Sequence, residues 1–140
     1  MVSIGVSKKE KVMRTCVLAA VVVFASTGAG LAQDATAGKD VFSRMCLPCH
    51  DAGEGARVKL GPPLNGVDGR KAGSAEGFNY SDAMKGSGIT WSEAQFKDYI
   101  KAPMQKVPGT RMAFAGLRDE GEAASLWAYL KQFGDDGKPK

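Results

Sequence analysis

The stretch Cys46-Leu47-Pro48-Cys49-His50 decides how the rest of this sequence is interpreted. In a C-x-x-C-H motif, two thiols can form thioether bonds with the two vinyl groups of one porphyrin, and the histidine brings an imidazole to the iron. The two-residue gap puts both sulfur atoms on one side of the ring. His50 is the only histidine in the chain, so no other imidazole competes for the iron. The motif therefore predicts one covalently bound haem c with His50 as its proximal ligand.

Two other uses of a C-x-x-C pair are less consistent with this chain. A zinc site needs four ligands, and beyond the motif the chain offers only Cys16, which lies in a segment expected to be removed. A redox dithiol needs no adjacent histidine, and no βαβ pattern surrounds the motif. Haem attachment remains the favoured interpretation.

Residues 1–32 have the pattern of a secretory signal peptide. Four basic residues between Lys8 and Arg14 precede the apolar run 17–25, and Gly30-Leu31-Ala32 provides small residues ahead of a cut before Gln33. The apolar run is too short to cross a bilayer as a helix, so a membrane anchor is the weaker alternative. The expected organisation is a signal peptide at 1–32 and one domain at 33–140 in the periplasm, because bacterial haem attachment to cysteines takes place outside the cytoplasm.

Removal of that segment changes the charge balance of the chain. The full sequence has 19 basic and 15 acidic residues, and segment 1–32 contains four of the basic residues and one of the acidic ones. The remaining domain has a net charge of about +1, so the sequence pI of about 9.0 says little about it. We therefore expect no nucleic-acid partner.

The remaining sequence alternates between helical patterns and glycine-rich loops. A helix is expected from Gly38 into the motif, since Val41, Phe42 and Met45 recur at about one turn. The segment 51–79 contains seven glycines and two prolines, which predicts a loop able to approach a flat ligand closely. Further helices are expected at 81–85, at 93–102 after an N-cap at Ser92, and from Asp119-Glu120 to Gly134, with a mobile tail at 135–140. The fold class is all-α.

A second iron ligand is required unless one axial position stays open. Methionine is the obvious donor, because a thioether is soft and raises the reduction potential. Met45 is too close to the motif to reach round the ring, Met84 and Met104 fall on predicted helices, and Met112 lies in the irregular segment 107–114. A loop can carry a side chain to the opposite face of the haem, but a methionine can equally fill a core. Position alone leaves both roles open for Met112.

The sequence from Gly38 to Phe133 resembles class I cytochrome c, the short mitochondrial-like type found in bacteria as cytochrome c2. The matching stretches occur in the family's order without insertions: Gly38 to Phe42, the C-x-x-C-H motif, Gly61-Pro62, Gly69-Arg70-Lys71, Gly77-Phe78-Asn79-Tyr80, Gly88-Ile89-Thr90-Trp91, Tyr99, the segment 108–116 and Leu126 to Leu130. The resemblance implies a cytochrome c fold, with a few helices around one covalent haem and the N- and C-terminal helices packed together.

The same resemblance implies a role for individual residues, position by position. Cys46 and Cys49 would hold the haem, His50 and Met112 would bind the iron, and the Pro62 carbonyl would accept the other ring N–H of His50. Arg70, Tyr80 and Trp91 would surround a buried propionate, Tyr99 and Thr110 would lie on the methionine side, and Phe114 would cover the exposed haem edge. Without the resemblance, Tyr80 and Trp91 would be read as core aromatic residues and Arg70 as a surface charge.

Two departures from the family pattern concern the haem surroundings. Met84 falls where the family commonly has an asparagine. The basic ring expected around the haem edge is only partly present, as Arg57, Lys59, Lys106, Arg111 and Arg118.

The resulting functional prediction is a soluble periplasmic one-electron carrier, monomeric and not an enzyme. It would shuttle electrons from a quinol–cytochrome c reductase to a terminal oxidase or a photosynthetic reaction centre. A dedicated electron acceptor or donor of a periplasmic dehydrogenase is an alternative that the sequence does not separate. A haem enzyme of peroxidase type is a further alternative, but it needs an open distal side, and Met112 in a close family motif argues against it.

Overall fold

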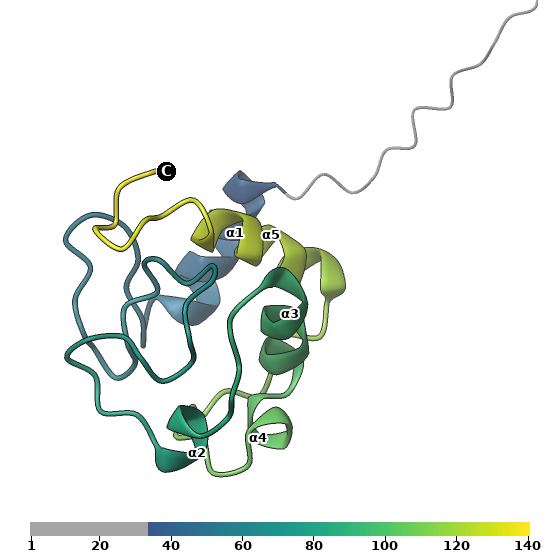
Figure 1. The fold of residues 1–140 in the computed structure, drawn as a ribbon. Helices are drawn as coiled ribbons and strands as arrows, with labels where there is room; N and C mark the ends of the chain where they lie inside the picture. Colours follow the sequence, from purple (N-terminus) through teal and green to yellow (C-terminus); the bar gives the residue numbers. More distant parts are fainter. Residues whose placement is uncertain (1–33) are drawn as a thin grey trace, which may run out of the picture.

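The computed structural model describes residues 34–140, so the predicted signal peptide at 1–32 lies outside the described residues. The elements are α1 (Ala35–Val41), the single π-helical turn η1 (Phe42–Cys46), α2 (Asp82–Lys85), α3 (Glu93–Lys101), α4 (Pro103–Lys106) and α5 (Glu120–Leu130). Within the described part, β structure is limited to two isolated bridges, Lys71 with Thr90 and Phe133 with Pro139. Figure 1 shows α1 beside α5 at one end of the molecule and the short helices α2 and α4 at the other. The all-α prediction is confirmed.

The first helix continues into the C-x-x-C-H motif as predicted, but it starts earlier and ends in a wider turn. Asp34 is the N-cap and accepts a hydrogen bond from the backbone N–H of Thr36 at 2.8 Å. The last turn is of π type, because the Leu47 N–H donates to the Phe42 carbonyl at 2.9 Å, five residues back. The His50 N–H then donates to the Cys46 carbonyl at 2.8 Å, so the whole motif is held by backbone hydrogen bonds.

Helices α1 and α5 cross in close contact, which confirms the predicted packing of the terminal helices. A Cβ on Gly38 would lie 1.9 Å from the Ser125 carbonyl oxygen and 2.8 Å from the Tyr129 Cβ. Only a glycine allows the two backbones to approach this closely. One turn further on, the rings of Phe42 and Tyr129 pack with their centroids 5.5 Å apart.

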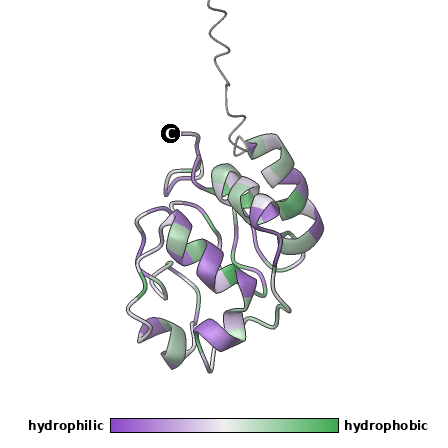
Figure 2. Cartoon of the chain, turned by 90° about the vertical axis from the view of Figure 1, so that its right-hand side faces the viewer, coloured by the Kyte–Doolittle hydropathy of each residue, from purple (hydrophilic) through white to green (hydrophobic). Residues whose placement is uncertain are grey.

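Three later helices begin at side chains that cap their first backbone N–H groups. Ser81, Ser92 and Asp119 each accept a hydrogen bond from the N–H three residues on, at 3.1, 3.3 and 2.8 Å. These starts agree with the sequence analysis. Helix α3 is amphipathic and buries Phe96, Tyr99 and Ile100, and Figure 2 shows hydrophilic and hydrophobic positions along the helical ribbons.

The predictions for the C-terminus are wrong in two respects. Helix α5 ends at Leu130, four residues before Gly134, and the tail is not mobile but folds back on itself. The Lys140 N–H donates to the Gln132 carbonyl at 2.8 Å, and the Gly134 N–H donates to the Lys138 carbonyl at 2.9 Å. The turn depends on a backbone φ of +79° at Gly137 and on partners in a distant loop, which a local pattern does not show.

The core consists of two clusters of buried side chains. The larger one joins the terminal helices to α3 and includes Leu126 and Leu130, each only 1 % exposed, and the ring pair Phe96–Trp127. The smaller one contains Ala72, Met84, Ile89, Tyr99 and Val107. Trp91 and Met112 pack against both clusters. The predicted site residues therefore gather in the space between the two clusters.

Candidate haem-binding site

A cavity of about 400 Å³ has members of both core clusters in its walls. Ten of the eleven predicted site residues line it: Cys46, Cys49, His50, Pro62, Tyr80, Trp91, Tyr99, Thr110, Met112 and Phe114. The eleventh, Arg70, is not a lining residue. Other walls come from side chains to which the sequence analysis gave no role in the site, among them Leu64, Val67, Phe78 and Ile100. Their hydrophobic character alone does not distinguish a cavity wall from ordinary core.

The imidazole of His50 is held from two directions. Its Nδ1–H donates to the Pro62 carbonyl at 2.8 Å, which leaves Nε2 with a lone pair. The neighbouring Gly61 lies against the ring, since a Cβ there would be 2.4 Å from the His50 Cε1. Burial lowers the pKa of His50, an effect to which the nearby Lys59 charge adds and which the Pro62 hydrogen bond opposes. The ring is therefore neutral at physiological pH, the form that binds a metal.

The two thiols differ in their exposure. Cys46 is buried and Cys49 is exposed, and they form no disulfide. Burial raises the pKa of the Cys46 thiol to about 11, and the neighbouring Cys49 adds to the rise. Redox dithiols work through a thiol whose pKa is lowered. The environment of Cys46 thus argues against the redox-dithiol interpretation of the motif.

Met112 is distinguished from the other methionines by its hydrogen bond. The Tyr99 hydroxyl donates to the Met112 sulfur at 3.4 Å and lies 3.2 Å from the Thr110 hydroxyl. Met104 is 63 % exposed and does not line the cavity, so it has no access to a ligand there. Met45 and Met84 do line the cavity, and Met84 is packed in the smaller cluster at 7 % exposure.

Arg70 lies behind the cavity wall, and its guanidinium is only partly satisfied. Its terminal nitrogens donate to the Asn65 carbonyl at 2.6 Å and to the Pro63 carbonyl at 3.4 Å. Its Nε is buried and has no hydrogen-bond partner. Burial lowers the pKa of Arg70, and the nearby Tyr80 and Asp135 oppose that change. A buried donor without a partner costs roughly 1–3 kcal/mol, so Nε favours an anionic oxygen beside it.

These observations together fit a haem. One cavity with largely hydrophobic walls brings together two thiols, an imidazole nitrogen and a thioether sulfur. The unpartnered Nε of Arg70 suits the carboxylate of a propionate. The residues that would hold the haem are the predicted ones, and their individual roles toward it stay predictions.

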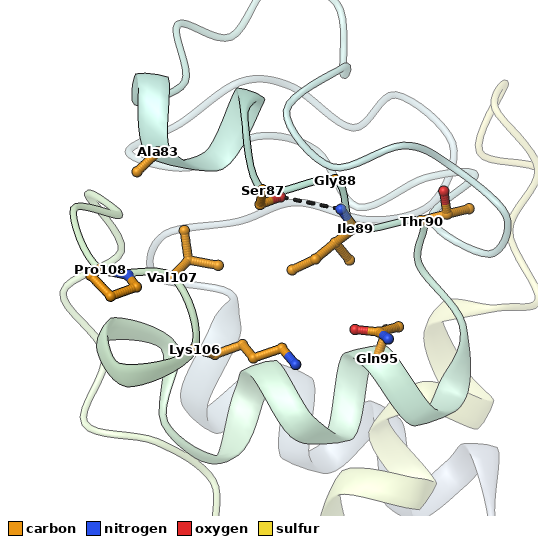
Figure 3. A pocket seen from close by; sticks show the side chains of 9 residues that line it. All are labelled: Ala83, Ser87, Gly88, Ile89, Thr90, Gln95, Lys106, Val107 and Pro108. Carbon is orange, nitrogen blue, oxygen red and sulfur yellow. Dashed lines mark hydrogen bonds between the residues drawn. The ribbon is translucent and has the colours of Figure 1, made fainter.

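A second hollow, of about 690 Å³ and more open to solvent, lies on the other side of the smaller core cluster. Figure 3 shows its lining, with Lys106 and Gln95 on one side and Ser87 and Ile89 on another. None of the predicted site residues lines it, and Lys106 is already paired with Asp98. It is therefore not a candidate for the haem.

The chain is similar to known proteins over nearly all of the residues that the structure describes. A cytochrome c family model matches residues 35–134. The chain belongs to the cytochrome c family. It is 59 % identical over 108 residues to cytochrome c2 of Rhodoplanes tepidamans, covering 77 % of this chain and 100 % of that protein. It is 52 % identical over 128 residues to cytochrome c2 of Blastochloris viridis, covering 91 % of this chain and 100 % of the relative.

A solved structure of a cytochrome is also similar to this chain. Cytochrome cH from Methylobacterium extorquens matches with a TM-score of 0.65 and 43 % identity, over 71 % of this chain and 98 % of that chain. The cytochrome c fold predicted from the sequence is confirmed.

Membership of this family establishes the cofactor and the class of function. A cytochrome c carries a covalently bound haem c, and this chain is an electron carrier of the cytochrome c2 type rather than an enzyme. The peroxidase alternative is thereby set aside. Within residues 34–140, no helix is long and apolar enough to cross a membrane.

Proposed function

We propose that this cytochrome c is exported by the signal peptide at 1–32 and works in the periplasm as a monomer. It shuttles single electrons from a quinol–cytochrome c reductase to a terminal oxidase or a photosynthetic reaction centre. The observation that carries this proposal is that His50 and Met112 line one cavity and each is oriented by a hydrogen bond: His50 donates to the Pro62 carbonyl, and Met112 accepts from the Tyr99 hydroxyl. Two such ligands would leave no open position for a substrate.

The chain's own residues have distinct tasks in this proposal. The haem supplies a metal centre that takes up and releases one electron. Cys46 and Cys49 hold it covalently, while His50 and Met112 bind its iron. Arg70 and Tyr80 neutralise and bury a propionate, and Phe114 covers the haem edge. The hydrogen bonds that orient His50 and Met112 in this structure would restrain both side chains toward the iron and so limit their reorganisation when an electron moves.

The basic surface expected around the haem edge has less unpaired positive charge than the number of its basic residues indicates. Of the five basic residues expected around the haem edge, only Arg111 lines the cavity, while Lys59 pairs with Asp51 at 3.8 Å and Lys106 pairs with Asp98. Lys59 also donates to the carbonyls of Leu47 and His50, at 3.0 and 3.2 Å. Arg111 borders the cavity and donates to the Asn79 carbonyl at 3.2 Å. Arg111 is therefore the cation best placed to steer an acidic partner toward the haem edge.

Two measurements test this proposal. The intact mass of the periplasmic protein should equal residues 33–140 plus one haem, and a mass that includes residues 1–32 refutes the signal peptide. Purified membranes should reduce the ferric protein with quinol and oxidise the ferrous protein with oxygen or light. Reduction by a periplasmic dehydrogenase with its substrate, and by no membrane complex, would instead establish the dedicated-partner alternative.

A further inference from the structure

The C-terminal segment 134–140 packs against the loop that follows the haem-attachment motif, as Figure 1 shows for the end of the chain and the 50s loop. The Gly66 N–H donates to the Phe133 carbonyl at 3.2 Å, just before the segment begins. A Cβ on Gly137 would lie 2.2 Å from the Gly53 carbonyl oxygen, and a Cβ on Gly66 would lie 1.8 Å from an Asp135 carboxylate oxygen. The C-terminal segment and the loop after the motif therefore meet closely at Gly53, Gly66 and Gly137, because these three residues have no side chain.

Asn65 connects this contact to Arg70. Its side-chain amide donates to the Gly53 carbonyl at 3.0 Å and accepts from the Gly53 N–H at 2.7 Å. A Cβ on Gly137 would lie 2.7 Å from the same amide nitrogen. The backbone carbonyl of Asn65 accepts the 2.6 Å hydrogen bond from Arg70. Asn65 thus contacts the tail on one side and the guanidinium on the other.

We propose that segment 134–140 is a clasp that holds Asn65 in place and thereby positions the Arg70 guanidinium beside the haem cavity. The proposal rests on the proposed role of Arg70 toward a haem propionate. Asp135, Asn65 and Gly137 are positioning residues in this scheme, because they act through Arg70 and line no part of the cavity. Arg70 itself makes no hydrogen bond to the tail, so the coupling runs through Asn65 and through charge.

Asp135 gives the clasp an electrostatic effect as well. Its negative charge is close enough to Arg70 to oppose the fall in the pKa of Arg70 that burial causes. It therefore also offsets part of the positive potential that the guanidinium creates in the cavity. A positive potential favours the ferrous over the ferric state, so removing the Asp135 charge should raise the reduction potential.

The first test compares two adjacent carboxylates on the purified haem-containing protein. Asp135→Asn should raise the midpoint potential at least about twice as far as Asp136→Asn, because both remove one exposed charge but only Asp135 lies near Arg70. Asp135→Glu should restore the original potential. Equal shifts in the two asparagine variants, or no shift in either, overturn the electrostatic part of the proposal.

The second test addresses positioning through hydrogen exchange. Gly137→Ala forces a strained backbone against the Gly53 carbonyl, whereas Gly134→Ala meets no heavy atom closer than 3.2 Å. Strain of this kind opens the local structure more often, so the amides of Gly53 and Gly66 should exchange about tenfold faster or more in Gly137→Ala and at the original rate in Gly134→Ala. Unchanged exchange in Gly137→Ala overturns the clasp.

Neither test uses a redox partner, so each is independent of which membrane complexes the protein serves. Arg70→Lys separates the clasp from the role of Arg70. If this variant leaves the midpoint potential unchanged, Arg70 has no role toward the propionate and the proposal fails. A change in potential in Arg70→Lys together with the two expected results above establishes the proposal.

Discussion

Tyr99 donates its hydroxyl hydrogen bond to the sulfur of Met112 across 3.4 Å, from helix α3 to the irregular segment that follows α4. Thr110 lies within 3.2 Å of the same hydroxyl, so the tyrosine joins two residues of that segment. The contact orients the thioether, and it distinguishes Met112 from the two other methionines that line the cavity.

We predict that Met112→Ala abolishes the methionine–iron absorption band and lowers the reduction potential, because the soft sixth ligand is lost. Visible absorption spectra and potentiometric titration of the purified protein check both effects. Met84→Ala and Met104→Ala serve as controls that should keep the band. Loss of the band in either control would show that the ligand is assigned to the wrong methionine.

We predict that a single methyl group added between α1 and α5 destabilises the folded protein. Gly38→Ala places a Cβ 1.9 Å from the Ser125 carbonyl, so the helices must separate, and overpacking of this kind costs about 1–3 kcal/mol. Gly121→Ala on α5 is the matched control, since its nearest contact is an Asp119 side-chain oxygen at 3.2 Å. Denaturant unfolding should show Gly38→Ala destabilised and Gly121→Ala equal to or more stable than the original protein.

Removal of the haem should leave the chain largely unfolded. The cavity of about 400 Å³ has core residues in its walls, Leu126 and Leu130 among them, and without the haem these side chains lose their partner. A domain of this size has little other core to compensate. Far-UV circular dichroism of Cys46→Ala/Cys49→Ala, produced without haem, should show most of the helical signal lost. A cooperative thermal transition in that variant would contradict this expectation.

Charge at the cavity rim should control the rate at which partners react. Arg111→Glu is expected to slow electron transfer with the membrane complexes most strongly at low ionic strength, because exposed charges are screened beyond about 8–10 Å at physiological salt. Lys138→Glu makes the same charge change in the C-terminal segment, away from the rim. Stopped-flow rates at several salt concentrations compare the two variants. Equal slowing by both would refute docking at the haem edge.

Tyr80 should limit stability at alkaline pH. Burial raises the pKa of Tyr80 above its ordinary value of 10.0, against the opposing effect of Arg70. A group whose pKa is raised in the folded state stabilises the protein fully below its unfolded pKa and loses that effect as the pH rises through the folded value. The free energy of unfolding should therefore fall as the pH rises above about 10, and fall less in Tyr80→Phe. Identical pH profiles for the two proteins would show that Tyr80 does not titrate with unfolding.

Local features of the sequence were enough to predict several elements. The C-x-x-C-H motif, the N-cap at Ser92, the helix start at Asp119-Glu120 and the glycine-rich loop depend on neighbouring residues only, and each occurs as expected. The resemblance to class I cytochrome c also predicted which residues would meet, and ten of the eleven line one cavity. The π-turn in η1 was missed, because one shifted hydrogen bond leaves no mark on hydrophobic periodicity.

The sequence by itself determined which covalent chemistry to expect, since the order of two thiols and an imidazole in Cys46 to His50 favours a haem over a zinc site or a redox dithiol. Tertiary structure alone decided the conformation of the C-terminal segment and the burial of Arg70. The tail reads as a polar segment with no periodicity, and its conformation depends on contacts such as that of Gly137 with Gly53, which lies far away in sequence. Arg70 is likewise buried with its Nε unpartnered, which its place in the sequence does not show. Contacts between distant residues come from the packing of the whole chain, and no local pattern encodes them.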